Sequence, residues 1–452
     1  MKKIKQSKIH IISLGCSKNL IDSEVMGGLL NKSGLQMIDR NDSADIVIVN
    51  TCAFINPAKE ESLEEILTLA AEKKKGNRQF KLVVAGCLAQ RYGKELSAQI
   101  PEVDLFIGTG EVGNIVRHIN KLDEIKSRRA VIISKPDFLM TSQHPRILTP
   151  TMASAYLKIS DGCSNCCSYC VIPSLRGRAR SRTPKDILRE AQMLAKKGIK
   201  EIIIIGQDTT AYGRDLKSRP KLAILLKDMA QIQGIKWIRL LYAHPAHITT
   251  DVMEAIATNE KICRYIDLPI QHIDDTILSA MNRKVAGVKI KDIIAQARQI
   301  IPDLALRTSL IVGFPGETSK RFEKLMDFVR ETKFDHLGVF IYSREEGTDA
   351  AQLKSQIPEK EKERRRDLIM TEQAAISHAI NTGLIGSIQE VLIEEKSDRQ
   401  DFDFVGRCRR QAPEIDGITY VKGTHTKIGS IVKYKITAAD DYDLFGEMVG
   451  RH

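Results

Sequence analysis

Short apolar runs recur along the first third of the chain, and each run ends at a cysteine. The runs cover residues 9–14, 45–49 and 81–85, and the cysteines that close them are Cys16, Cys52 and Cys87. A stretch with helical periodicity follows each run, over residues 22–32, 57–75 and 89–99. This alternation predicts a parallel α/β sheet in a first domain over residues 1–140.

The middle of the chain repeats the same alternation after a linker rich in Pro, Ser and Thr over residues 141–154. Strands are expected at 156–159, 201–205, 237–242, 265–269, 305–312 and 336–342. Helices are expected at 184–197, 219–233, 251–259, 274–282 and 289–301, and a charged connecting helix over 359–380. Six strand–helix repeats predict a partial (β/α) barrel over residues 150–380, with its chemistry at the carboxyl ends of the strands.

The last part of the chain changes to short β-like runs separated by Gly, Asp and Pro. The runs lie at 387–394, 402–408, 418–422, 431–438 and 444–449. Five short strands predict a small closed β-barrel over residues 384–452.

The three cysteines of the first domain are predicted to meet. Because ligands gather at the carboxyl ends of parallel strands, Cys16, Cys52 and Cys87 should converge at one edge of the sheet. The alternative for any one of them is a buried thiol, a common fate for cysteine. Gly15 and Gly86 favour a bulky cofactor here, since glycine lets the backbone turn tightly beside it.

A second group of cysteines follows the first strand of the central region. Cys163, Cys167 and Cys170 stand in Cys-x-x-x-Cys-x-x-Cys spacing. Thiolates are soft ligands for zinc or iron–sulfur clusters, and three of them can hold three irons of a 4Fe-4S cluster and leave the fourth iron open. The alternative is a structural zinc site, which normally needs four ligands in paired spacing, the fourth being Cys166 or a distant residue.

Composition supports metal chemistry and an acidic partner. The chain has 452 residues, a formal charge of +12 and nine cysteines. An odd and unevenly spread set of cysteines disfavours a disulfide framework and indicates a reducing compartment. No apolar run approaches the length of a membrane span, so we expect a cytoplasmic protein. The positive charge favours RNA or a ribonucleoprotein as partner.

The spacing of Cys163, Cys167 and Cys170 after a strand resembles the radical S-adenosylmethionine (SAM) enzymes. Two three-cysteine sets in this order narrow the resemblance to the methylthiotransferases. Residues 13–24, Ser-Leu-Gly-Cys-Ser-Lys-Asn-Leu-Ile-Asp-Ser-Glu, and residues 50–55, Asn-Thr-Cys-Ala-Phe-Ile, closely match the signatures of that family. The resemblance covers the whole chain and implies a methylthiotransferase domain with an auxiliary cluster, a radical SAM core and a TRAM-like barrel.

The resemblance also implies the cofactors: SAM and two 4Fe-4S clusters on the six cysteines, with no further catalytic side chain. Gln207 and Asp208 follow the second barrel strand, where radical SAM enzymes contact the amino group of SAM. Arg307 on the fifth strand is a candidate for the SAM carboxylate, because guanidinium pairs with carboxylate in bidentate geometry. His272 and the 313–317 turn are open to a purely structural interpretation.

Two substrates are possible within the resembled family: an adenosine of tRNA, or an aspartate of ribosomal protein uS12. Two short motifs resemble those of the family members that modify the ribosomal protein: Tyr-Ala-His-Pro at residues 242–245 and Asp-Tyr-Asp-Leu-Phe-Gly at residues 441–446. From residue 384 onward, ten Lys and Arg stand against twelve Asp and Glu, and such a barrel suits a basic protein better than RNA.

We therefore expect a radical SAM methylthiotransferase acting on the β-carbon of an aspartate of uS12, served by an electron donor. In the reaction that the resemblance implies, one SAM methylates a sulfur at the auxiliary cluster, and a second is cleaved to a radical that removes hydrogen from the β-carbon. The rival interpretation from another class is a non-catalytic zinc or iron–sulfur protein that binds the ribosome.

Overall fold

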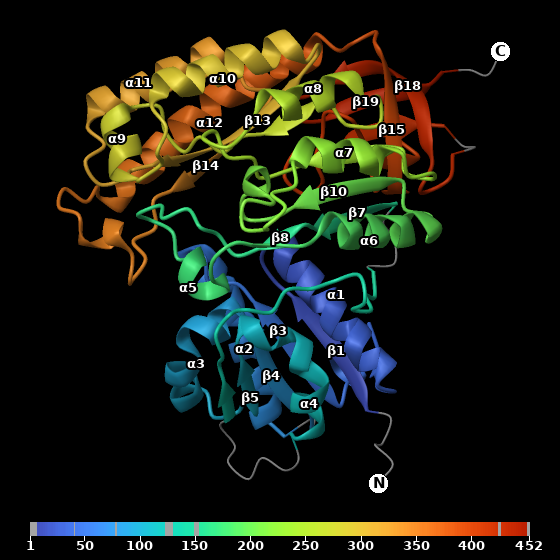
Figure 1. Ribbon diagram of the computed structural model, residues 1–452, viewed down its shortest axis with the longest axis vertical. Helices are drawn as coiled ribbons and strands as arrows, with labels where there is room; N and C mark the ends of the chain where they lie inside the picture. The colour runs from blue at the N-terminus through green and yellow to red at the C-terminus, as the bar shows by residue number, and fades with distance from the viewer. Residues whose placement is uncertain are drawn as a thin grey trace.

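The computed structural model describes residues 7–39, 41–76, 79–122, 130–148, 153–423 and 426–449. The amino-terminal sheet forms one end of the molecule, and the central barrel and the carboxyl-terminal barrel lie side by side at the other end (Figure 1). Of the predicted linker, residues 149–152 lie outside the described residues. The domain boundaries themselves stay predictions.

The amino-terminal sheet has six parallel strands in the order β2-β1-β3-β4-β5-β6. Its strands are β1 Lys8–Ser13, β2 Gln36–Met37, β3 Ile46–Thr51, β4 Lys81–Gly86, β5 Leu105–Ile107 and β6 Ala130–Ile132. Its helices are α1 Ser17–Lys32, α2 Asn56–Lys74, α3 Cys87–Gln99 and α4 Ile115–Asn120. The predicted parallel sheet is confirmed. Two helices begin earlier than predicted, α1 directly after Cys16 and α3 at Cys87.

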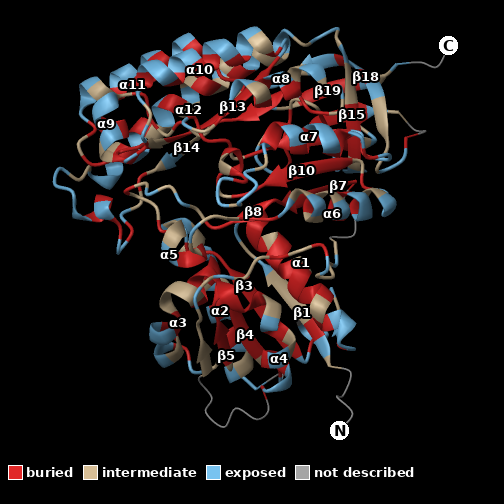
Figure 2. Cartoon of the chain, in the orientation of Figure 1, coloured by how far each residue is buried: buried red, intermediate tan, exposed pale blue. Residues whose placement is uncertain are grey.

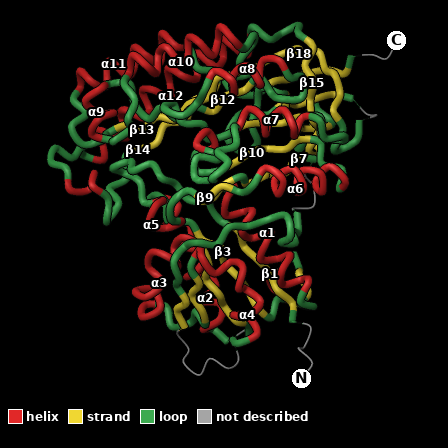
Figure 3. Tube along the Cα trace, viewed as in Figure 1, coloured by secondary structure: helices red, strands yellow, loops and turns green. Residues whose placement is uncertain are grey.

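The central strands form two parallel sheets, β11-β10-β7 and β12-β13-β14, which meet at a bridge between Ile238 and Ile262. The strands are β7 Ser154–Lys158, β10 Glu201–Ile205, β11 Trp237–Leu240, β12 Tyr265–Asp267, β13 Ala305–Val312 and β14 His336–Ile341. The strands are largely buried and helices cover them (Figures 2 and 3). The six strands of the predicted partial barrel are therefore confirmed.

The helices around these strands are α6 Pro184–Lys196, α7 Leu222–Ala230, α8 Thr250–Thr258, α9 Asp275–Ala280, α10 Gly287–Ile300, α11 Ser319–Thr332 and α12 Glu359–Thr382. Helix α11 was missing from the sequence prediction, although Phe322, Leu325, Met326 and Val329 repeat with helical spacing and are all buried. After β7 the chain forms the short hairpin of β8 Ser160–Asp161 and β9 Arg180–Ser181, which encloses α5 Ile172–Arg176.

The carboxyl-terminal strands close into a barrel in the order β15-β16-β17-β19-β18. They are β15 Ile388–Lys396, β16 Phe404–Cys408, β17 Thr419–Lys422, β18 Ile431–Ala439 and β19 Leu444–Met448. All five lie on the predicted β-like runs, so this barrel is confirmed as well.

A buried charge network joins this barrel to the start of the central strands. Glu201, at the first position of β10, accepts from Arg239 at 2.8 Å and from Arg407 of β16 at 2.6 Å. All three side chains are buried. Since a buried ion is costly unless it is paired, the two barrels are held in one orientation.

We predict that Glu201→Gln lowers the free energy of unfolding by about 3–5 kcal/mol, because it leaves two buried guanidinium groups without their shared carboxylate. Trp237 is the one tryptophan of the chain, and its ring centroid lies 5.3 Å from Arg409 Cζ beside this network. Its fluorescence in a urea titration therefore measures the change in the free energy of unfolding. Glu447→Gln is the control, because Glu447 pairs with Lys422 on the surface and should matter by less than about 1 kcal/mol. Equal effects of the two variants would contradict the prediction.

Candidate functional site

The structure brings Cys16, Cys52 and Cys87, the amino-terminal triad, to one edge of the first sheet. Asn19 of α1 joins the strand ends that carry them: its Nδ2 donates to Leu14 O at 3.0 Å and to Thr51 O at 2.8 Å. The Oδ1 of the same side chain lies 4.0 Å from Cys87 Sγ. The predicted convergence is therefore present.

Two glycines make this edge possible. Gly15 has φ +86°, and a Cβ there would lie 2.5 Å from the Cβ of Cys52. Gly86 has φ +92°, and its Cβ would lie 2.7 Å from Thr51 O. Both positions therefore need glycine for its conformation and for its lack of a side chain.

Cys163, Cys167 and Cys170, the central triad, lie on the loop between β8 and α5 at the carboxyl end of the first central strand. The loop is fixed by backbone hydrogen bonds, from Cys163 N to Gly177 O at 3.0 Å and from Cys170 N to Cys167 O at 3.0 Å. Cys166 lies outside this set, exposed to solvent. Cys263 and Cys408 are buried thiols.

Buried thiols in both triads have raised pKa values. Burial and the neighbouring Cys16 and Cys87 raise the pKa of Cys52 to about 12. In the central triad, burial raises the pKa of Cys170 to about 12, and its neighbours Cys167 and Cys163 add to the shift. Cys52 and Cys170 therefore hold protons that a bound metal would displace.

The two alternatives for the triads, a single zinc ion and a cluster, require different distances between the three sulfur atoms. Three sulfurs on one tetrahedral zinc lie about 3.8 Å apart, since each Zn–S bond is about 2.3 Å. Within the described part of the chain, the one set of three potential ligands whose atoms all lie within 4.8 Å of one another is Asp208, His244 and His247, not a cysteine triad. A cluster binds each thiolate through a different iron, so it needs its three sulfurs farther apart than one zinc ion does.

A buried network of four charged side chains lies between the two triads. Lys158 Nζ donates to Asp22 of α1 and to Asp161 of β8, each at 2.7 Å. Arg176 of α5 donates to Asp22 at 2.9 Å and, through Nη2, to Asn19 Oδ1 at 2.5 Å. Asn19 packs on the amino-terminal triad, and Asp161 lies two residues before Cys163. The network therefore connects the two sites directly.

A second contact crosses the boundary between the amino-terminal and central domains, here called the seam, and involves α2 and α3 rather than α1. The carboxylate of Glu345, in the loop after β14, accepts from Lys59 of α2 at 2.9 Å and from Arg91 of α3 at 2.6 Å. The described part of the predicted linker makes a separate contact, since Arg146 pairs with Glu24 of α1 and with Glu190 of α6.

Gln207 presents an acceptor where the resemblance expects one. Its Nε2 donates to Asp161 Oδ1 at 3.0 Å, while its buried Oε1 has no hydrogen-bond partner among the described atoms. An unpaired buried acceptor fits the ammonium group of SAM. The role of Gln207 toward SAM stays a prediction.

Asp208 is already fully engaged within the protein. Its carboxylate accepts from Asn165 of the cysteine loop at 2.8 Å, from His247 at 2.6 Å and from Thr210 at 2.8 Å. Although burial raises the pKa of Asp208, the hydrogen bond from His247 and the charges of the two histidines lower it to about 2. Its visible task is to hold Asn165, and its SAM contact stays a prediction.

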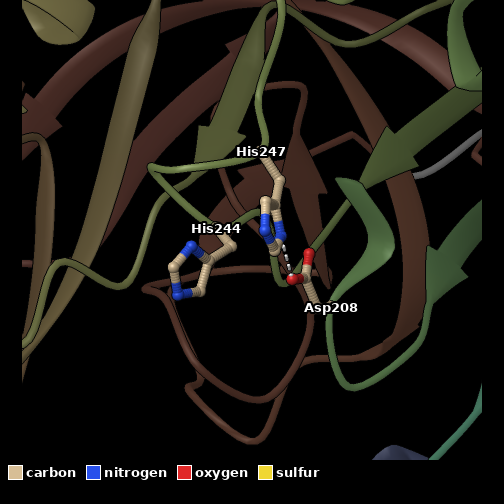
Figure 4. Close-up of side chains that lie close together, drawn as sticks. All are labelled: Asp208, His244 and His247. Carbon is tan, nitrogen blue, oxygen red and sulfur yellow. Dashed lines mark hydrogen bonds and ion pairs between the residues drawn. The ribbon is translucent and has the colours of Figure 1, made fainter. Parts of the chain in front are cut away.

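His244 completes a set of three potential metal ligands with Asp208 and His247 (Figure 4). Burial and the nearby Arg283 lower the pKa of His244 to about 3. The Nδ1 of His244 accepts from Ala246 N at 3.1 Å. A neighbouring guanidinium and an occupied Nδ1 disfavour a cation, so the set supports the cysteine loop.

Arg307 is paired with protein carboxylates. It donates to Asp267 Oδ1 at 2.9 Å, and its Nε lies 3.3 Å from Asp416 Oδ1 in the loop before β17. A SAM carboxylate would have to displace one of these partners, and the predicted contact remains untested. His272 is fully buried, and its Nδ1 accepts from Asp274 N at 2.9 Å, as a structural histidine does.

Sequence reasoning missed the segment that closes over the central triad. Asn282 donates to Cys166 O at 2.7 Å, and Arg283 donates to Cys167 Sγ at 3.7 Å. These residues follow α9, more than a hundred positions from the cysteines, and no local pattern marks them. Lys158 did carry a signal, since it is a charged residue inside an otherwise apolar strand.

Comparison with known families defines the class of the protein. The Radical SAM superfamily matches residues 157–329, the TRAM domain matches residues 385–449, and the uncharacterized protein family UPF0004 matches residues 8–108. The chain is thus a radical SAM protein, and an iron–sulfur cluster and SAM are its cofactors.

The relatives narrow this class to one family. The chain is 55% identical, over 99% of both chains, to a protein of Syntrophus aciditrophicus named ribosomal protein uS12 methylthiotransferase RimO. It is 47% identical to the protein of the same name from Geobacter sulfurreducens, over 98% of this chain and 99% of the relative. The chain belongs to the uS12 methylthiotransferase RimO family.

Solved structures agree on the fold. The radical SAM methyltransferase TsrM of Kitasatospora setae matches with a TM-score of 0.55 at 14% identity, over 74% of this chain and 73% of that chain. None of the helices in the described ranges is long and apolar enough to span a membrane.

We predict that Lys158→Met destabilises the protein by about 3–5 kcal/mol, because Asp22 and Asp161 then share the charge of Arg176 alone in a buried site. Urea unfolding followed by far-UV circular dichroism measures the effect. Lys221→Met is the matched control, since Lys221 pairs with Asp251 at 4.0 Å in the open and should change stability by less than about 1 kcal/mol. An unchanged free energy of unfolding in Lys158→Met would show that the network does not hold the two domains together.

Proposed function

We propose that this chain adds a methylthio group to the β-carbon of an aspartate in ribosomal protein uS12. The observation that carries the proposal is the placement of two cysteine triads on either side of one buried charge network. The 55% identity to a protein named as a uS12 methylthiotransferase supports the substrate. A C–H bond at this carbon is too weakly acidic for a side-chain base, so the reaction requires a radical.

Two 4Fe-4S clusters fit the donors of this chain. The central triad would hold the cluster that binds SAM, and the amino-terminal triad would hold the auxiliary cluster. When bound, the clusters supply the electron that cleaves SAM to a 5′-deoxyadenosyl radical and the place where the transferred sulfur is held. The thiols of both triads offer three ligands each, which leaves one iron of each cluster without a protein ligand.

The side chains around the triads orient these components. Gln207 offers its free Oε1 to the amino group of SAM. Asp208 fixes the cysteine loop through Asn165. The network of Lys158, Asp22 and Arg176 keeps the two triads at a constant separation, and fixed proximity of sulfur donor and radical source is a large part of the rate.

The proposed reaction consumes an electron and therefore requires an electron donor. The competing substrate is an adenosine of tRNA, used with the same cofactors. A TRAM barrel with two more acidic than basic residues suits a basic ribosomal protein better than the phosphates of RNA.

The first test is the intact mass of uS12 from cells with and without this gene. We expect a methylthio-sized increment that disappears on deletion and returns with the wild-type gene. Cys163→Ala should abolish SAM cleavage, whereas Cys87→Ala should retain uncoupled cleavage and lose sulfur insertion, because each removes a ligand from a different triad.

Cys166→Ala is the control for these variants, since this exposed cysteine belongs to neither triad. An unchanged mass of uS12 would overturn this substrate and favour an adenosine of tRNA instead. Normal sulfur insertion by Cys87→Ala would overturn the auxiliary cluster, and a colourless, zinc-loaded protein after anaerobic reconstitution would overturn the radical mechanism.

We predict that Gln207→Met weakens SAM binding by roughly 10- to 100-fold, as expected for loss of a hydrogen bond to a charged group. Equilibrium binding of SAM to the anaerobically reconstituted protein measures this, with iron content as the check on cluster assembly. Gln231→Met, at an exposed position after α7, is the control. Equal SAM affinity of the Gln207 and Gln231 variants would remove Gln207 from the site.

A further inference from the structure

The segment after α9 clasps the loop of the central triad through its backbone. Met281 O accepts from Ser168 N at 3.1 Å, and Ala280 O accepts from Ser168 Oγ at 2.7 Å. Asn282 and Lys284 have φ values of +55° and +53°, a left-handed conformation that non-glycine residues adopt only under constraint. The residue between them, Arg283, is therefore held in a fixed direction.

Arg283 points its guanidinium at a cysteine of the triad from a buried position. Its Nη1 donates to Cys167 Sγ at 3.7 Å and its Nη2 to Pro269 O at 2.5 Å. Its Nε has no hydrogen-bond partner among the described atoms. The side chain is only 6% exposed.

Arg283 differs from the other buried arginines in its lack of a carboxylate partner. Arg176, Arg239 and Arg407 each form a close ion pair with a buried Asp or Glu. In the described ranges, no carboxylate lies within the 4.0 Å ion-pair distance of Arg283. A buried unpaired cation is strongly unfavourable, so a neighbouring anion must balance it.

The carboxylate of Asp208 acts on Arg283 from beyond ion-pair distance, and the anion that Arg283 contacts directly would be the thiolate of Cys167 in the central triad. A 4Fe-4S cluster with its three thiolates would carry a net negative charge even after the charge of its irons is counted, and a buried guanidinium needs such a negative charge nearby. We propose that Arg283 is the counter-ion of Cys163, Cys167 and Cys170, and that its N–H···S contact to Cys167 raises the reduction potential of the cluster bound there. Arg283 is thus a positioning residue, and this inference rests on the cluster assignment in the proposed function.

The charge of Arg283 determines the direction in which it shifts the reduction potential. Reduction adds an electron to the cluster, and a nearby cation that donates to a sulfur stabilises the more negative, reduced state. Loss of the guanidinium should therefore make the midpoint potential more negative. A given electron donor then reduces less of the cluster, so SAM cleavage slows when that donor is limiting. Partners beside the ligands of a metal site typically change affinity or activity by roughly 10- to 100-fold.

The test uses the full-length chain with Cys16, Cys52 and Cys87 changed to Ala, so that one triad remains. In this background, Arg283→Gln and Arg283→Lys are reconstituted with iron and sulfide. Iron content and a redox titration followed by electron paramagnetic resonance give the occupancy and the midpoint potential. We expect a more negative potential and, with the electron donor limiting, at least roughly tenfold slower SAM cleavage for Arg283→Gln, with Arg283→Lys between it and the parent. Arg330→Gln, a surface arginine paired with Glu372, is the control and should match the parent.

Each outcome supports or overturns the role of Arg283 as a counter-ion. An unchanged potential in Arg283→Gln with the cluster present overturns this inference and leaves the proposed function intact. Iron lost from Arg283→Gln but kept by Arg283→Lys supports the counter-ion role, whereas iron lost from both shows that packing rather than charge is needed and overturns it. A parent that binds no iron overturns the cluster assignment itself, and this inference with it.

Discussion

The buried contact of Lys158 and Arg176 with Asp22 and Asp161 is the constraint on which the arrangement of this protein depends. Two cations and two anions out of water are stable only when all four are present in good geometry. Asp22 comes from the amino-terminal domain and the other three from the radical SAM core. Docking of the two domains is thus coupled to the pairing of these charges, which makes a misaligned seam unfavourable.

The two ends of the central barrel have separate tasks. Glu201 and Asp416 anchor the carboxyl-terminal barrel near the start of the central strands, while the cysteines, Gln207 and Asp208 lie beyond the carboxyl ends. Division of a (β/α) barrel into a stabilising end and a reactive end is the general rule. Arg307 belongs to the first group by its partners, and for this reason strand position alone was a weak guide to its role.

Local patterns predicted most of the helices and strands, although not α11, and singled out the six cysteines, because apolar periodicity and ligand spacing are properties of neighbouring residues. Gln207 was a candidate through the resemblance to radical SAM enzymes, and its role toward SAM stays a prediction. Local patterns could not reveal Arg283 or the pairing of Lys158 with Asp22, whose partners lie 116 and 136 positions away. The first contact arises from packing within the central domain and the second from packing between domains, and the charge of Lys158 in a mostly apolar strand was the single hint.

The charges around the two cysteine triads connect the packing of the domains with cluster assembly. Burial raises the pKa values of Cys52 and Cys170 to about 12, so these two thiols hold protons at neutral pH in the absence of a metal. Binding of iron must expel those protons and leave buried thiolates. The chain has arranged positive charge for that state: α1 and α3 begin at the cysteines of the amino-terminal triad, where helix dipoles favour anions, and Arg176 and Arg283 lie against the two triads. Arg176 reaches its place only when the domains dock, so assembly of the amino-terminal cluster and closure of the seam favour each other.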